Sequence, residues 1–129
     1  MKIIHIITDL DTGGAEMMLY KLLDSLRDDR IDSTVISLMG RGKITERIEA
    51  LGVKVETLNL GQGEHPSWRT IKKLRQFMRA FNPDIVQGWM YHGNIAATVA
   101  VFLFDPMCRK VKLFWNVRQT LYDINSEKI

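Results

Sequence analysis

Four features that define common protein classes are missing from this sequence. Cys108 is the single cysteine among 129 residues, which excludes an internal disulfide framework and fits a reducing cytoplasm. The longest apolar stretch, "IAATVAVFLF", is too short to span a bilayer, and the N-terminus lacks the cleavage site of a signal peptide. No paired cysteines or clustered histidines predict a metal site.

The usual patterns of nucleotide and nucleic-acid binding are also absent. Gly13 and Gly14 are adjacent, so they do not form the G-x-G-x-x-G pattern of dinucleotide sites, and no Walker lysine follows them. Basic residues are not interleaved with aromatic residues in the manner of single-strand binders. The sequence therefore predicts neither a NAD or ATP cofactor nor a nucleic-acid partner.

What is present is the composition of one globular domain over residues 1–129. Hydrophobic residues make up 46% of the chain and charged residues 26%, as in ordinary soluble proteins. The net charge of +3 permits an anionic partner without requiring one.

Apolar runs typical of buried strands alternate with helical patterns along the chain. The predicted strands are Lys2–Thr8, Ser33–Met39, Val53–Leu60, Asp84–Trp89 and Lys110–Val117. This alternation predicts an α/β fold, a doubly wound and Rossmann-like parallel sheet with helices on both faces. The third run begins with apolar and polar residues in alternation, which predicts a position near the edge of the sheet.

Four helices are predicted between these strands. The apolar stripe of the first is Ala15, Met18, Leu19, Leu22, Leu23 and Leu26, and that of the third is Trp68, Ile71, Leu74, Met78 and Phe81. Gly52 is placed to end the second helix, Ser67 to begin the third and Pro83 to stop it. The fourth helix, "GNIAATVAVFLF", is apolar on most sides, which predicts deep packing.

If the strand order is 3-2-1-4-5, ligands are expected between the first and fourth strands, where the loops "DLDTGGAE" and "MYHGN" would face each other. Gly13 and Gly14 would let an anion approach the N-terminus of the first helix. The alternative is a tight turn in which Gly13 caps the helix and Glu16 completes a capping box. Asp9 and Asp11 could act as acid or base groups, or only cap the turn.

The second segment carries Tyr91, His92 and Asn94. Aromatic, imidazole and amide groups together suit a ligand rich in hydroxyls. The alternative is that Trp89 and Tyr91 pack in the core and that His92 or Asn94 caps the next helix. His5 lies in the middle of a strand and is predicted to be a core histidine.

Two basic features offer further anion sites. Arg118, after the fifth strand, could hold a phosphate or carboxylate, or form a surface salt bridge. The third predicted helix carries Arg69, Lys72, Lys73, Arg75 and Arg79. The Arg69–Arg79 helix could present an ordinary solvated face, or a patch that meets an anionic membrane or a polyanionic acceptor.

Taken together, "IIHIITDLDTGGAEMMLYKLLDSL", "ALGVKVETLNL", "NPDIVQGWMYHGNIAA" and "FWNVRQTLYD" resemble the N-terminal domain of family-four retaining glycosyltransferases, which have the GT-B fold. The resemblance implies transfer of a sugar from a nucleotide-diphosphate sugar to a hydroxyl acceptor, either a sugar or lipid-linked, without a metal. It also implies a second, donor-binding domain outside residues 1–129, so this chain alone is expected to be inactive. The expected location is the cytoplasm, with the inner face of the membrane as an open alternative.

The resemblance also implies roles for single residues. Gly13 and Gly14 would approach the donor diphosphate. The catalytic candidates are His92 and Arg118, and the acceptor-binding candidates are Asp11, Tyr91, Asn94 and Gln119. His92 and Asn94 match the "HxN" pattern of the family, whereas Gln87 and the Arg118–Gln119 pair stand where its members often have histidines. A non-catalytic flavodoxin-like binding module and half of a sugar-nucleotide epimerase remain alternatives.

Overall fold

The computed structural model describes residues 1–10, 14–26, 30–60, 67–105 and 110–116. Its strands and helices alternate along the whole of this length, as the sequence predicts. In order they are β1 (Lys2–Ile7), α1 (Gly14–Ser25), β2 (Asp32–Ser37), α2 (Thr45–Glu49), β3 (Lys54–Thr57), α3 (Trp68–Phe81), β4 (Ile85–Trp89), α4 (Met90–Phe104) and β5 (Lys112–Asn116).

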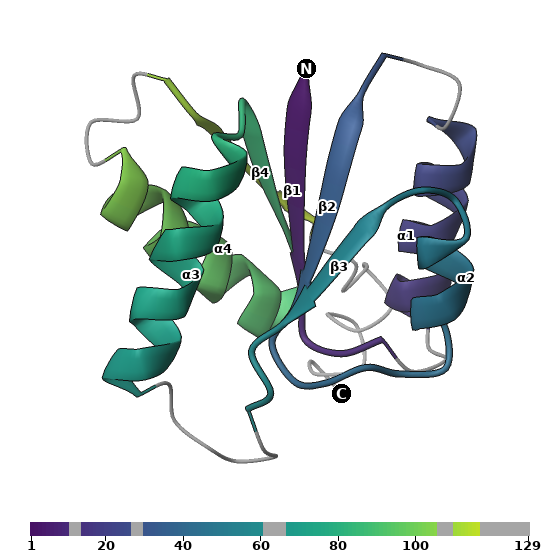
Figure 1. Cartoon of the computed structure of the whole chain (residues 1–129), viewed down its shortest axis with the longest axis horizontal. Coiled ribbons are helices and arrows are strands. Elements are labelled where there is room, and N and C mark those ends of the chain that lie inside the picture. The colour runs from purple at the N-terminus through teal and green to yellow at the C-terminus, as the bar shows by residue number, and fades with distance from the viewer. Residues whose placement is uncertain (11–13, 27–29, 61–66, 106–109, 117–129) are drawn as a thin grey trace, which may run out of the picture.

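All five strands are parallel and lie in the order β3-β2-β1-β4-β5, which confirms the predicted order. In the register of the sheet, His5 of β1 lies between Val35 of β2 and Gln87 of β4. Helices α1 and α2 cover one face and α3 and α4 the other (Figure 1). The doubly wound, Rossmann-like prediction is therefore confirmed.

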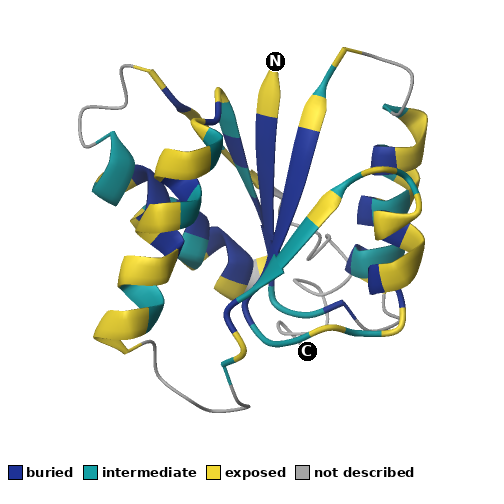
Figure 2. Ribbon diagram, in the orientation of Figure 1, coloured by how far each residue is buried: buried dark blue, intermediate teal, exposed yellow. Residues whose placement is uncertain are grey.

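The central strand β1 is buried on both faces. Ile4 and Ile6 pack into a core with Met78 of α3 and Ala97 of α4, whereas Ile7 packs into a second core with Leu19 of α1. Successive side chains of a strand point to opposite faces, so a strand between two helical layers must be apolar throughout. This explains the nearly continuous apolar run at the start of the chain, most of which is buried (Figure 2).

Strand β3 lies at one edge of the sheet, as predicted from its alternation. None of its four residues is fully buried. Lys54 and Glu56 point to the same face and form an ion pair of 3.1 Å. Charged side chains on an edge strand discourage pairing with another chain.

Two of the three predicted helix ends are confirmed. Gly52 does not cap α2, because Ala50 is the C-cap, but it follows with a φ of +87°, a conformation that glycine adopts without steric cost. Ser67 begins α3 by accepting a hydrogen bond from the backbone N–H of Thr70. Asn82 ends this helix in the left-handed conformation directly before Pro83, which cannot continue it.

Three predictions about helix faces are wrong. Trp68 is 79% exposed and Met18 is also exposed, although both fit the predicted apolar stripes. The deep packing predicted for α4 fails along one side, where Ile95, Val99 and Phe102 are exposed. Those three positions lie on one side of the helix, away from the sheet. Spacing along the helix identifies a stripe, but the extent of the neighbouring layer decides how much of that stripe is covered.

Candidate functional site

The two segments singled out in the sequence lie at the same edge of the sheet. Strands β1 and β4 are parallel neighbours, paired from Ile3 and Ile85 to Ile6 and Gly88. Their carboxyl ends therefore meet at one edge, where α1 and α4 begin (Figure 1). In open α/β sheets this point of reversed strand order is the usual position of a ligand site.

The second segment is not a loop, contrary to the sequence prediction. Helix α4 begins at Met90, directly after the last residue of β4, so His92 and Asn94 already belong to the helix. The alternative that either residue caps this helix is also wrong, because Trp89 occupies the N-cap position and no side chain caps it. Met90 makes the sharp turn with a φ of +66°, which is costly for a side chain of this size.

Two glycines let the first turn of α4 press against the strands. A Cβ atom at Gly93 would lie 2.6 Å from the backbone oxygen of Ile6 in β1. A Cβ atom at Gly88 would lie 2.6 Å from the Cα atom of Asn94. Both contacts are shorter than any side chain tolerates. The helix therefore begins in direct contact with the carboxyl ends of β1 and β4.

The first segment is anchored to the protein on its way out of β1. Leu10 is fully buried, and its carbonyl oxygen accepts a hydrogen bond of 3.0 Å from the backbone N–H of Ile44. The carbonyl of Thr8 accepts another, of 2.9 Å, from the backbone N–H of Met39. These bonds hold the chain at the edge of the sheet until shortly before α1 begins at Gly14.

The polar groups of this edge differ in accessibility. Gly14 and His92 are exposed, each in the first turn of its helix. Asn94 is only 7% exposed, and its Oδ1 atom has no hydrogen-bond partner among the described residues. That oxygen faces Gly88, where it would be 2.6 Å from an added Cβ. His92 is thus exposed to solvent, whereas Asn94 is almost fully buried.

The edge also carries two helix N-termini. Free N–H groups and the helix dipole make such termini attractive to anions. The first turn of α4 contains no acidic residue, whereas α1 carries Glu16 in its first turn. The N-terminus of α4 is therefore the more favourable of the two for a negatively charged ligand.

His5 and Trp89 lie beneath this edge in the core, as predicted. The indole N–H of Trp89 donates a hydrogen bond of 3.0 Å to Nδ1 of His5, and the rings are tilted at 52°. Burial lowers the pKa of His5 from 6.5 to about 4. The imidazole is therefore neutral near pH 7 and carries its proton on Nε2, which is buried without a partner among the described residues. These residues support the site and do not face it.

Several candidates fall outside the described residues. Asp11, Gly13, Arg118 and Gln119 lie there, and so does the predicted capping box at Gly13. The side chain of Tyr91 is likewise not described. The roles expected of these residues stay predictions.

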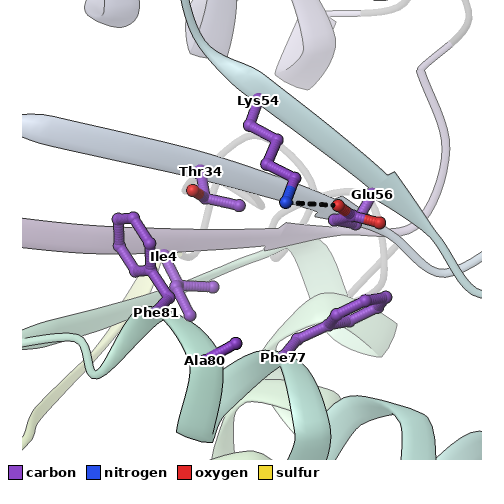
Figure 3. Close-up of a pocket in the computed structure, with 7 residues that line it drawn as sticks. All are labelled: Ile4, Thr34, Lys54, Glu56, Phe77, Ala80 and Phe81. Carbon is purple, nitrogen blue, oxygen red and sulfur yellow. Dashed lines mark ion pairs between the residues drawn. The ribbon is translucent and has the colours of Figure 1, made fainter.

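A separate small cavity of about 100 Å³ lies under α3, at the amino-terminal half of the strands. It is lined by Ile4, Thr34, Lys54, Glu56, Phe77, Ala80 and Phe81 (Figure 3). Its position away from the carboxyl edge separates it from the candidate site. Within the described ranges, no group of three or more metal-binding side chains occurs. In those same ranges, no helix combines the length and apolar character needed to cross a bilayer.

Sequence reasoning missed the importance of Gly88 and Gly93. A glycine inside a strand often marks a close approach of another segment, so Gly88 gave a local signal. Gly93 gave none, because its constraint comes from the backbone oxygen of Ile6, far away in the sequence. Neither glycine has a reactive group, but both determine how closely α4 packs against β1 and β4 at the site.

Comparisons with known proteins agree with the α/β fold. The family model described as Glycosyltransferase Family 4 matches residues 12–113, most of the chain. No curated protein sequence matches. Among solved structures, the chain is similar to a deacetylase triple mutant involved in the teicoplanin biosynthetic pathway. The TM-score is 0.56 at 12% identity, over 95% of this chain and 67% of that one. At this identity the likeness shows the α/β fold alone.

Proposed function

The chain belongs to glycosyltransferase family 4, and from this premise we propose that the full-length protein transfers a sugar from a nucleotide-diphosphate sugar to a hydroxyl acceptor with retention of configuration. The observation that carries the proposal is the family match over residues 12–113. The packing of α4 onto the ends of β1 and β4 supports it, because this packing brings Gly14 and His92 to one edge of the sheet.

In the proposed reaction, the bond between the anomeric carbon and the phosphate oxygen breaks. A new bond forms between that carbon and the acceptor oxygen, and the acceptor proton passes to the departing phosphate. Negative charge therefore develops on the phosphate, and N–H groups already oriented toward it would lower the barrier. The protein would contribute mainly by positioning the two reactants.

The residues would share this work as follows. Gly13, Gly14 and the N-terminus of α4 would lie near the donor diphosphate. His92, which is exposed, would contact the reacting groups. The other acceptor-side candidates are Asp11, Tyr91, Asn94 and Gln119, and Arg118 would add a cation. We place the reaction in the cytoplasm, where the acceptor could be a sugar or a lipid-linked hydroxyl.

We expect substitution of His92 by alanine to lower kcat/KM for sugar transfer about 100-fold, because a side chain that positions or exchanges a proton typically contributes this much. Since His92 is exposed, the melting temperature should change by only a few degrees. The full-length protein would be screened against nucleotide sugars by thermal shift, and transfer of a labelled sugar then measured. Met18→Ala, at an exposed position of α1 outside the site, is the matched control.

Two outcomes would contradict the proposal in different ways. Conversion of a nucleotide sugar with no acceptor present would indicate an epimerase of the same fold. Binding of a nucleotide sugar without any turnover would indicate a non-catalytic module. Equal activity of the His92→Ala and Met18→Ala proteins would show that His92 takes no part in the reaction. The proposed sugar transfer itself would still stand.

A further inference from the structure

The positive charge of the chain is concentrated on one helix. The whole chain has 18 basic and 15 acidic residues. Helix α3, "WRTIKKLRQFMRAF", contains five basic residues and no acidic residue. The remainder therefore has 13 basic against 15 acidic residues and a net charge of −2. The chain is thus cationic because of a single element.

Part of this charge forms an ordered row on the outer surface. Trp68, Lys72, Arg75 and Arg79 follow one another at spacings of four, three and four residues, which places them on one side of a helix. All four are exposed, whereas Leu74 and Met78 on the opposite side are buried in the core (Figure 2). We call these four residues the α3 stripe.

Within the described residues, no cation of the α3 stripe forms an ion pair. Lys73 differs, because its Nζ atom donates a hydrogen bond of 3.1 Å to the carbonyl of Thr57 and lies over the ring of Phe77. One cation of the helix is therefore held against the protein, while those of the stripe are available to an external anion.

Trp68 is the unusual member of the stripe. Its indole is 79% exposed, although burying so large a side chain would be strongly favourable. Tryptophan is enriched where an apolar phase meets water, because its ring is apolar and its N–H is polar. An exposed indole in line with three cations fits the headgroup region of an anionic bilayer better than a purely polar polyanion.

We infer that the α3 stripe docks the protein on an anionic lipid surface. Helix α3 begins at the carboxyl edge of the sheet, the edge that also carries Gly14 and His92 (Figure 1). A bilayer held against the stripe therefore lies beside the candidate site. The inference does not depend on the sugar transfer reaction, because binding to lipid is measured without donor or acceptor.

The test is co-sedimentation of the protein with vesicles. Vesicles of phosphatidylglycerol and phosphatidylcholine in equal amounts should bind the protein, whereas pure phosphatidylcholine should not. Replacing Lys72 and Arg75 by glutamine should weaken binding about 25-fold, since each cation near an anionic surface contributes about fivefold. Added salt should weaken the binding of the wild-type protein as well.

A matched control changes the same charge elsewhere. Lys21 of α1 and Lys43 before α2 are exposed in the layer on the other face of the sheet. Their joint replacement by glutamine should leave binding within about twofold of wild type, because a charge held away from the lipid by more than a Debye length is screened. Equal losses in the two double variants would overturn the inference.

Tryptophan fluorescence gives a second readout. The chain has three tryptophans, of which Trp89 is buried and Trp115 lies on β5. Emission should shift to shorter wavelength when anionic vesicles are added, and Trp68→Phe should abolish most of that shift. Binding to heparin without binding to vesicles, or a shift that persists in Trp68→Phe, would contradict docking on lipid through the stripe.

Discussion

Replacing Gly88 by alanine is expected to lower the free energy of unfolding by about 3 kcal/mol, the upper end of what overpacking of a core usually costs. The added methyl group would meet the Cα and Oδ1 atoms of Asn94 at 2.6 Å and the backbone oxygen of Gly93 at 2.8 Å. Two of these three atoms belong to the backbone of α4, so no side-chain rotation can relieve the contact. The helix would have to move away from β4. Urea denaturation of the purified protein measures the loss.

The matched control is Gly40→Ala. A Cβ at Gly40 would meet Asn59 Oδ1 at 3.6 Å, an ordinary contact, and the residue does not have a positive φ. Alanine there should leave stability unchanged or raise it by up to about 1 kcal/mol, because it reduces the freedom of the unfolded chain. If Gly88→Ala and Gly40→Ala unfolded at the same urea concentration, the close packing of α4 on β4 would be wrong.

Gly93→Ala tests the other side of the same contact. Its methyl group would meet the carbonyl oxygen of Ile6 at 2.6 Å, so the first turn of α4 would be displaced from β1 instead of β4. A loss similar to that of Gly88→Ala is expected. In an assay of the proposed sugar transfer, both variants should lose more activity than their stability alone explains, because His92 moves with the first turn.

The stability of the protein is also expected to fall by about 3 kcal/mol between about pH 6.5 and pH 4 through His5 alone. Burial lowers the pKa of His5 from 6.5 to about 4 in the folded protein. Below pH 6.5 the unfolded chain binds a proton that the folded chain does not, so acid favours unfolding. Above pH 6.5 this contribution vanishes. Unfolding curves at a series of pH values measure the slope of the free energy of unfolding against pH.

Two variants separate the charge of His5 from its hydrogen bond. His5→Asn keeps an acceptor for the indole N–H of Trp89 but cannot titrate, so the slope should disappear. Trp89→Phe removes the donor and lowers stability, yet His5 stays buried and the slope should remain. An unchanged slope in His5→Asn would show that other groups, such as carboxylates, cause the acid sensitivity.

For the fold, most elements could be predicted from local patterns of apolar residues. A strand such as β1, buried on both faces, needs apolar residues throughout, and helices between such strands need one apolar stripe. Both patterns are local, so the sequence was enough to predict nine elements in the right order. Ser67 and Asn82–Pro83 also act within their own turns, and the helix ends predicted from them are confirmed.

For the site, the sequence identified the two segments but not their form. The sequence predicts too late a start for α4, because "MYHGN" has the composition of a loop and Gly93 is a poor helix former. In the structure, Met90 adopts a positive φ and the helix begins at once. The contact of Gly93 with Ile6 depends on two strands that are distant in sequence, so no local pattern could report it.

The sequence by itself determined the α/β order, the strand at the edge and the buried positions of His5 and Trp89, because each depends on the polarity of neighbouring residues. Only the tertiary structure decided which apolar residues remain uncovered, such as Trp68, and how closely α4 approaches β1. Both the covering of an apolar side chain and the distance between a helix and a strand depend on the position of a second element. These positions are set by the packing of segments that are distant in sequence. The backbone oxygen of Ile6, for example, leaves room only for glycine at position 93.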